Sequence, residues 1–407
     1  MLDIKLFIRL LLIGLGLALL AGRAEAVPSY ARQTGMACAA CHTVFPELND
    51  FGRTFKLNGY TLTGIKQVQA KESSSTSGLQ VNQIPPLSMM LQVSAAYSKD
   101  QTPTSQISLP DELSFFFAGE ISPHMGSFIQ LTMEQGTGFS LDNTDIRYAN
   151  HAGDVTYGVT LNNSPTVQDL WNSTPVWGYP YTHGPELSAP VVGDALAQNV
   201  AGLGGYADWG NGVYTELSFY RDTNEFDVND ATGVRISGLA PYWRLAWEPH
   251  MSGGDSWMIG TYGMQTSVID ATTYSGPADE YTDVAVDTQY QHMLANSNNS
   301  IGVHASYTNE KQTLDLSHPG DSPTLKSLRL DGTYYWGNHT AATLGYFTNS
   351  GYNSAYDDAA YTAELSYLPW QNTKFTMQYT GYTKLAGATG SAVSDNNTFL
   401  LNGWIMW

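Results

Sequence analysis

The stretch V-Y-T-E-L-S-F, residues 213–219, decides the fold because its character changes at every second residue. Val213, Thr215, Leu217 and Phe219 alternate with Tyr214, Glu216 and Ser218. Successive side chains of a β-strand point to opposite faces, so this stretch predicts a strand with one apolar and one polar face. The same alternation recurs in residues 155–161, 243–247 and 328–334. An apolar face toward lipid and a charged face toward a lumen are typical of an outer-membrane β-barrel.

The alternation predicts an all-β fold of sixteen antiparallel strands, and bacterial single-chain barrels have an even number. The strands are expected near residues 87–98, 111–121, 127–135, 142–149, 154–163, 200–208, 212–220, 235–247, 256–266, 281–292, 300–308, 326–335, 339–347, 359–368, 373–383 and 397–407. The connections alternate between long and short, which predicts outer loops and periplasmic turns. Because the first connection is long, both ends of the mature chain are expected in the periplasm. The alternative is a soluble β-sandwich or β-helix, which sixteen regular strands with lumen-facing charges disfavour.

Two further features of the barrel region point the same way. The chain ends F-L-L-N-G-W-I-M-W at residues 399–407, an alternating strand with a terminal aromatic that resembles the assembly signal of outer-membrane proteins. The third outer loop, residues 164–199, is long and rich in aromatic residues and proline: Trp171, Trp177, Tyr179, Tyr181, Pro165, Pro175, Pro180 and Pro185. Loops of this length are usually functional. We expect it to fold into the lumen as a constriction, as in general porins; the alternative is a cap on the outer surface.

The overall composition fits a membrane barrel and excludes several classes. Of the 407 residues only 14% are charged while 12% are aromatic, and the net charge is −19. Soluble domains usually have about 25% charged residues. The negative charge disfavours a nucleic-acid partner, because the phosphate backbone is also negative. The many aromatic residues disfavour a disordered chain. Two cysteines are too few for a disulfide scaffold.

The first 26 residues predict export. Lys5 and Arg9 precede an apolar run at residues 10–21, and A-E-A at residues 24–26 is a cleavage site. This pattern is a Sec-type signal peptide cut before Val27. The alternative is an N-terminal membrane anchor, for which the run is short. No later run is long enough for a membrane helix, so any span must be a barrel.

The motif C-A-A-C-H at residues 38–42 carries the clearest chemistry in the chain. Two thiols at this spacing can reach the two vinyl groups of one porphyrin, and the following histidine can bind the iron. We therefore predict that residues 27–65 form a small α-helical monohaem domain, held inside the lumen or at its mouth. One haem c is expected on Cys38 and Cys41, with His42 as the proximal ligand of its iron. The alternative is a redox C-x-x-C pair or a structural disulfide followed by a chance histidine.

The flanks of the motif suggest how the haem would be held. Phe45, Leu48, Phe51, Phe55 and Leu57 are expected to pack on the porphyrin; the alternative is ordinary core packing. Arg53 and Lys56 are predicted to pair with the haem propionates. A domain of about 40 residues rarely folds without a covalent crosslink or a bound cofactor, and covalent haem would supply both. Residues 66–85, which include S-S-S-T-S-G, predict a flexible linker to the barrel at 86–407.

The sequence leaves the second axial ligand open. No Met or His lies between Thr43 and Ser88, and Met36 lies only two residues before Cys38. A ligand from the rest of the chain, water, or an open position are the alternatives. Five barrel histidines fall at or beside expected short turns: His124, His151, His250, His292 and His339. Either one of them is the distal ligand or all are polar turn residues.

Several segments are similar to the fused cytochrome–porins of iron-oxidising bacteria. Residues 28–60 resemble the haem segment of that family, with A-R-Q-T-G at 31–35, C-x-x-C-H at 38–42 and F-G-R-x-F-K at 51–56. Residues 163–172 and 177–180 resemble its long loop, and residues 240–244 and 279–283 resemble its strand segments. The resemblance covers the whole mature chain and is most specific in the haem segment.

The resemblance implies an outer-membrane Fe(II) oxidase. Such a protein would take electrons from extracellular Fe(II) and pass them singly through the haem to a periplasmic c-type cytochrome or another soluble carrier. Only Cys38, Cys41 and His42 are carried over as haem residues, and no catalytic residue is assigned. Two alternatives remain: a conduit for another donor or for electron export, and a diffusion porin whose haem domain is a plug.

Acidic outer loops agree with a cationic substrate. The carboxylates expected there are Asp222, Glu225, Asp227, Asp230, Asp270, Asp279, Glu280, Asp357 and Asp358. A negative entrance would concentrate Fe²⁺. The alternative is that these acids bind divalent ions among surface lipids or keep the protein soluble.

Overall fold

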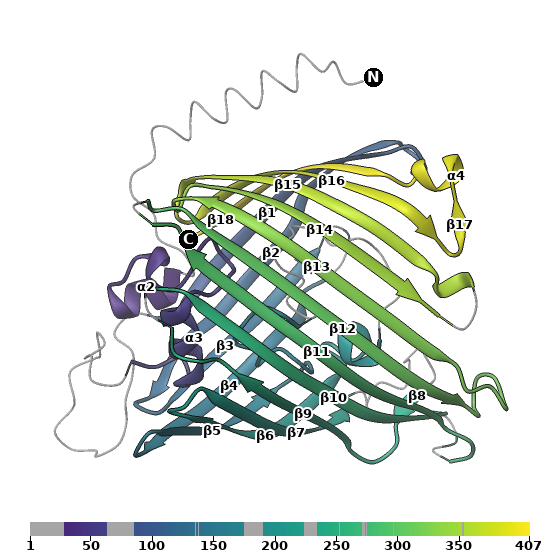
Figure 1. Cartoon of the computed structure of the whole chain (residues 1–407), viewed down its shortest axis with the longest axis horizontal. Helices are drawn as coiled ribbons and strands as arrows, with labels where there is room; N and C mark the ends of the chain where they lie inside the picture. Colours follow the sequence, from purple (N-terminus) through teal and green to yellow (C-terminus); the bar gives the residue numbers. More distant parts are fainter. Residues whose placement is uncertain are drawn as a thin grey trace.

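The computed structural model describes residues 28–62, 85–134, 136, 138–174, 190–223, 234–251, 253–270, 273, 275–295, 297–351 and 354–407. In this part of the chain, antiparallel strands form one closed barrel, which confirms the predicted fold class (Figure 1). The predicted signal peptide, residues 1–26, lies outside the described residues. So do residues 66–84, which are nearly all of the predicted linker.

Sixteen strands span the barrel in the described part of the chain. They are β1 (Leu87–Ser98), β2 (Ser105–Ser122), β3 (Met125–Glu134), β4 (Ser140–Ala152), β5 (Val155–Asn162), β6 (Val200–Trp209), β7 (Val213–Asp222), β9 (Ala240–Trp247), β10 (Ser256–Asp270), β11 (Asp279–Met293), β12 (Ser300–Leu314), β13 (Thr324–Trp336), β14 (Thr340–Ser350), β15 (Asp358–Trp370), β16 (Thr373–Leu385) and β18 (Thr398–Met406). The sheet also contains β8 (Val234–Ile236) and β17 (Ala388–Thr389), which are short and pair with the ends of β10 and β16. Strand β1 pairs with β18 and closes the barrel.

The strand boundaries depart from the sequence prediction in several places. Strands β2 and β12 extend several residues beyond the predicted 111–121 and 300–308, because their backbone pairing with neighbouring strands continues toward the long loops. The single strand predicted at 235–247 is divided into β8 and β9. Gly238 lies between them with a φ of +75°, a left-handed conformation that breaks the strand and that glycine adopts without strain.

The two faces of the wall follow the alternation seen in the sequence. Leu217 and Phe219 are exposed on the outside, whereas Glu216 and Ser218 between them are buried inside. The outer surface carries leucines, valines and aromatic residues on most strands, as a surface in contact with lipid requires. Among the described residues, no helix is long and apolar enough to cross a bilayer.

A short helical segment, residues 28–62, occupies the end of the barrel where the short turns lie (Figure 1). We call it the N-terminal segment. It contains α2 (Pro28–Thr34), the 3₁₀ turn η1 (Cys38–Ala40) and α3 (Asp50–Leu57). The remaining helical turns belong to the barrel loops: η3 (Val191–Ala195), η4 (Ser354–Tyr356) and α4 (Ser391–Ser394).

Hydrogen bonds attach the N-terminal segment to the barrel at separate points of its circumference. The Gln33 amide donates to the Ala118 carbonyl on β2 at 3.0 Å. The Ala39 amide donates to Gln371, in the turn between β15 and β16, at 3.3 Å. Arg53 forms an ion pair with Glu248, after β9, at 2.9 Å. Contacts to β2, β9 and the β15–β16 turn place the segment across this end of the lumen.

Candidate haem site

A cavity of about 360 Å³ lies between the N-terminal segment and the inner wall of β1–β4 and β18. Cys38, Cys41 and His42 all line it, as the motif predicts. Apolar side chains form much of its surface, and polar groups such as Gln92 and Glu112 line the wall of β1 and β2. The three residues of the motif therefore share one cavity, and part of its wall belongs to the barrel.

Local structure orients the imidazole of His42. Its Nδ1 donates to the carbonyl oxygens of Pro46 and Glu47, at 3.1 and 3.2 Å. These bonds place the proton on Nδ1 and the lone pair on Nε2, the atom that would bind a metal. Burial lowers the pKa of His42, which keeps the imidazole in its neutral, ligating form.

The two thiols lie on one tight turn. Cys38 begins η1 and Cys41 follows its end, and the Cys41 amide donates to the Cys38 carbonyl at 3.0 Å. The cysteines are thiols and are not joined in a disulfide. Burial, together with the neighbouring Cys38, raises the pKa of the Cys41 thiol to about 11. The Cys41 thiol is thus protonated near neutral pH, and both cysteines line the same cavity as His42.

Helix α3 is packed directly on the motif. Asn49 caps the helix by accepting from the Gly52 amide at 3.0 Å, and its own backbone amide donates to the Cys41 carbonyl at 2.9 Å. A Cβ at Gly52 would lie 2.1 Å from that carbonyl oxygen. Only glycine permits this approach, so the sequence N-D-F-G at residues 49–52 fixes the distance between helix and motif.

The residues that face the cavity fit a covalent c-type haem. The donor set is two thiols and one imidazole Nε2 on a single turn, beside an apolar surface. Four of the five apolar residues predicted to contact a porphyrin line the cavity: Phe45, Leu48, Phe51 and Phe55. Leu57 instead packs against the barrel interior near Trp171. A haem bound here would supply a carrier of single electrons.

Arg53 and Lys56, which were predicted to pair with the haem propionates, bind other groups of the protein in this structure. Arg53 donates to Gln291 at 3.0 Å and to Glu248 at 2.9 Å, and it does not line the cavity. Lys56 does line the cavity, and its ammonium donates to the carbonyls of Val167 and Asp169 at 2.7 Å each. Their pairing with propionates stays a prediction, while their observed role is to attach α3 to the barrel.

The start of the third outer loop lies inside the lumen, as predicted. All residues from 163 to 174 are buried. Trp171 packs on Tyr214 of the inner wall and donates to Glu248 at 2.7 Å. Asp169 pairs with Arg244, which also binds Asp287 on β11 at 2.7 Å. Residues 175–189, which include Trp177, Tyr179 and Tyr181, lie outside the described residues.

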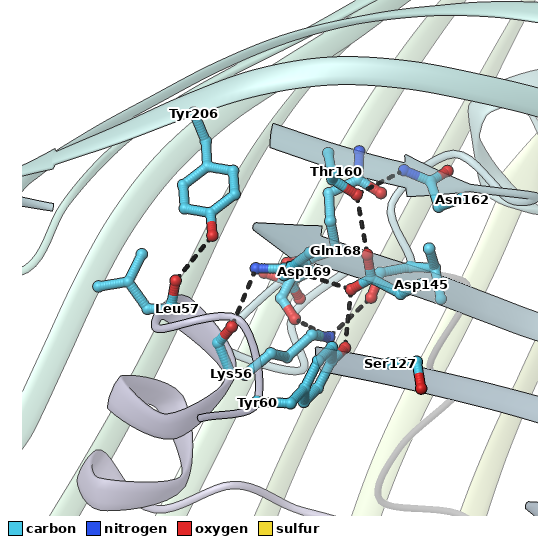
Figure 2. A network of polar contacts seen from close by, with 12 residues as sticks. Lys56, Leu57, Tyr60, Ser127, Asp145, Thr160, Asn162, Gln168, Asp169 and Tyr206 are labelled. Atoms are coloured by element: carbon cyan, nitrogen blue, oxygen red, sulfur yellow. Dashed lines mark hydrogen bonds and ion pairs between the residues drawn. The ribbon is translucent and has the colours of Figure 1, made fainter. Parts of the chain in front are cut away.

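A buried polar network joins this loop, helix α3 and the wall (Figure 2). Arg147 on β4 donates to Asp145 at 2.7 Å and to the Gln168 carbonyl of the loop at 2.6 Å. Tyr60 of the N-terminal segment donates to the same Asp145 carboxylate at 2.7 Å. Tyr206 on β6 donates to the Leu57 carbonyl at the end of α3 at 2.7 Å. The segment and the loop are therefore held in the lumen as one assembly.

Glu47 connects His42 to the opposite wall, formed by β11–β13. Its carbonyl accepts from His42, while its carboxylate meets His304 at 3.3 Å and accepts from Gln291 and Tyr335. Burial alone would raise the pKa of Glu47, but its bonds to His304, Tyr335 and Gln291 outweigh burial and lower that pKa. Glu47 is not among the residues predicted from the sequence, although its position between His42 and Arg53 was an available signal.

The remaining candidate residues have other surroundings. Among the described residues, none of His124, His151, His250, His292 and His339 lines the cavity. Of the outer acids, Asp279 and Asp358 are buried and accept from loop amides, and Asp222 and Asp357 form ion pairs. Glu225, Asp227 and Asp230 lie outside the described residues. Within the described part, no group of three or more His, Cys, Asp or Glu is placed to hold a metal ion.

Solved structures with a similar barrel identify the class of fold. A loop-deletion mutant of OmpT, an outer membrane protein of Vibrio cholerae, is 10% identical with a TM-score of 0.50, covering 79% of this chain and 98% of its own. Salmonella typhi OmpF in complex with daunomycin is 12% identical with a TM-score of 0.50, covering 79% of this chain and 97% of its own. The likeness shows the fold alone: a porin-like outer-membrane barrel. No protein-family model and no curated protein matches the chain.

Proposed function

We propose that this protein is an outer-membrane Fe(II) oxidase that passes electrons inward through a covalent c-type haem. The observation that carries the proposal is the position of Cys38, Cys41 and His42, which line one cavity formed jointly by the N-terminal segment and the barrel wall. A c-type attachment motif inside a membrane barrel brings a redox carrier to the place where the membrane would otherwise block electron flow.

The proposed reaction is a balanced one-electron transfer. Each Fe(II) ion becomes Fe(III) outside the cell, and one soluble periplasmic carrier, such as a c-type cytochrome, gains one electron. Ferric iron is insoluble near neutral pH, so oxidation outside keeps the product out of the cell. The net charge of −19 favours approach of a divalent cation.

The roles of the chain's own residues follow from their contacts. Glu47 and Pro46 orient the His42 imidazole through carbonyl oxygens. Lys56 and Asn172 attach the N-terminal segment to the third loop, because Lys56 donates to loop carbonyls and Asn172 accepts from the Leu48 amide at 3.1 Å. These contacts hold the segment that forms one side of the cavity in place, and a rigid site would lower the reorganisation that electron transfer requires.

The second candidate function is a diffusion porin that the N-terminal segment plugs. It is favoured by one observation: segment and loop together occupy the lumen and bind several strands. In that case Fe(II) would cross the wall by diffusion. The two functions predict different routes for the electron, and this difference can be measured.

The test uses the full-length protein in liposomes that enclose oxidised mitochondrial cytochrome c, with Fe(II) added outside under anaerobic conditions. The proposal predicts fast reduction of the enclosed cytochrome by the wild type and not by Cys41→Ser, in which covalent attachment is incomplete. Equal reduction with both proteins would show that Fe(II) passes through the pore and would support the porin. No reduction with either would refute inward electron transfer from Fe(II).

A further inference from the structure

We propose that Met90 of strand β1 is the second axial ligand of the haem iron. The N-terminal segment would then supply one ligand, His42, and the barrel wall the other. This proposal rests on one part of the proposed function, namely that haem is covalently bound at Cys38 and Cys41.

The cavity offers few side chains that can bind haem iron opposite His42. Among the described residues no other histidine lines it, and the methionines that do are Met36, Met90 and Met406. Tyr30 and Tyr60 also line it, but their hydroxyls donate to Ser127 and Asp145 at 2.6 and 2.7 Å. The Lys56 ammonium is committed to two carbonyls. A thioether is thus the ligand type that the cavity makes available.

The three methionines differ in where they lie around the cavity. Met36 is partly exposed and precedes Cys38 by two residues on the same segment as His42. Met90 is 2% exposed and lies on β1, between two strands that also line the cavity. Met406 is its partner on β18, but the next strand beyond, β16, contributes no lining residue. Met90 therefore lies on a strand that has lining strands on both sides, whereas Met406 lies on the strand at the edge of the lining wall.

Met90 also interrupts the polar face of its strand. The other inward residues around it, Ser88, Gln92 and Ser94, are polar and buried. An apolar side chain on this face is stable where other apolar side chains cover it, and here Met406 on β18 and Val44 and Phe45, close to His42 in the chain, belong to the same buried cluster. Ordinary packing accounts for the burial of Met90, whereas ligation accounts for its burial together with its place on a strand that lining strands flank on both sides.

Thioether ligation would suit the proposed electron donor. A Met/His pair raises the potential of a haem relative to a bis-histidine pair. A haem of higher potential accepts an electron from Fe(II) more favourably than one of lower potential. With Met90 as a ligand, the barrel wall would be part of the redox centre and would help to set the potential of the haem.

The experiment compares the full-length wild type with Met90→Leu and Met90→His in detergent. Met264→Leu is the matched control, because Met264 is a buried lumen methionine away from the cavity. The readouts are haem staining after denaturation, the thioether-to-iron charge-transfer band and spin state of the ferric protein, and the midpoint potential.

We expect all variants to keep covalent haem. Met90→Leu should lose the charge-transfer band, become high-spin and fall in potential, and Met90→His should return to low spin at a potential below the wild type. A purely structural role of Met90 would not produce that recovery. A wild type that lacks the band, or loss of the band in Met36→Leu or Met406→Leu but not in Met90→Leu, would overturn the assignment. Absence of covalent haem in the wild type would instead refute the proposed function.

Discussion

Replacing Lys56 by methionine should loosen the N-terminal segment from the barrel. The Lys56 ammonium is buried and donates to the carbonyls of Val167 and Asp169 at 2.7 Å each. Methionine keeps much of the side-chain volume but removes both donors, which leaves two buried carbonyls without this partner. Helix α3 would then retain the contacts of Arg53 and Leu57 but lose the hydrogen bonds of the Lys56 ammonium to the third loop.

The expected loss can be worked from these contacts. Hydrogen bonds to a charged group contribute about 1.5–3 kcal/mol each, and the cost of burying the ammonium offsets part of their sum. We therefore expect the docked state to lose about 2–4 kcal/mol, which corresponds to roughly 30- to 900-fold more frequent opening.

Native-state hydrogen exchange measures this opening directly. The amides of α3, residues 50–57, should exchange faster in Lys56→Met by that factor, while peptides from β11 and β12 should not change. Lys326→Met is the control, because Lys326 is an exposed lysine on the barrel strand β13. Exchange in α3 within about threefold of the control would refute the account of how the segment is held.

Three further predictions follow from other contacts. Gly52→Ala should reduce covalent haem loading, seen by haem staining, because the added Cβ would lie 2.1 Å from the Cys41 carbonyl oxygen. Arg244→Leu should raise ion conductance in planar bilayers, since it leaves the carboxylates of Asp169 and Asp287 without their cation and releases the third loop; unchanged conductance would contradict this. Burial lowers the pKa of Lys56 from 10.5 to about 7. Between pH 7 and pH 10.5 the unfolded chain therefore binds more protons at this residue than the native state does. A rise in pH through this range then stabilises the native state. The free energy of unfolding should therefore increase from pH 7 to pH 9 more in the wild type than in Lys56→Met.

The barrel was predictable because its signal is local. Each strand repeats with a period of two, and the solvent outside the wall is lipid, so positions such as Leu217 and Glu216 are assigned to opposite faces by their chemistry alone. The errors arose where backbone pairing, rather than side-chain chemistry, sets the boundary. Strand β2 begins at Ser105 because its pairing with β1 reaches that residue, and no apolar pattern marks the point.

The motif at residues 38–42 stands in the sequence itself, because haem attachment requires a fixed spacing of Cys and His, and its role as a haem site stays a prediction. The residues that surround the motif could not be predicted from the sequence. Lys56 carries the positive charge that a propionate partner needs. Its ammonium nevertheless donates to backbone carbonyls of residues more than a hundred positions away in the chain. Glu47 meets His304, and Met90 faces the cavity, only because the barrel closes around the N-terminal segment. Such pairs depend on register and docking, which single-sequence patterns do not encode.

The most direct test of the central claim is a visible spectrum of the purified, air-oxidised protein before and after anaerobic addition of Fe(II). The account predicts that the sharp bands of a reduced c-type haem appear within seconds in the wild type. A haem that dithionite reduces but Fe(II) does not would contradict the proposed oxidase and direct attention to another donor or to electron export.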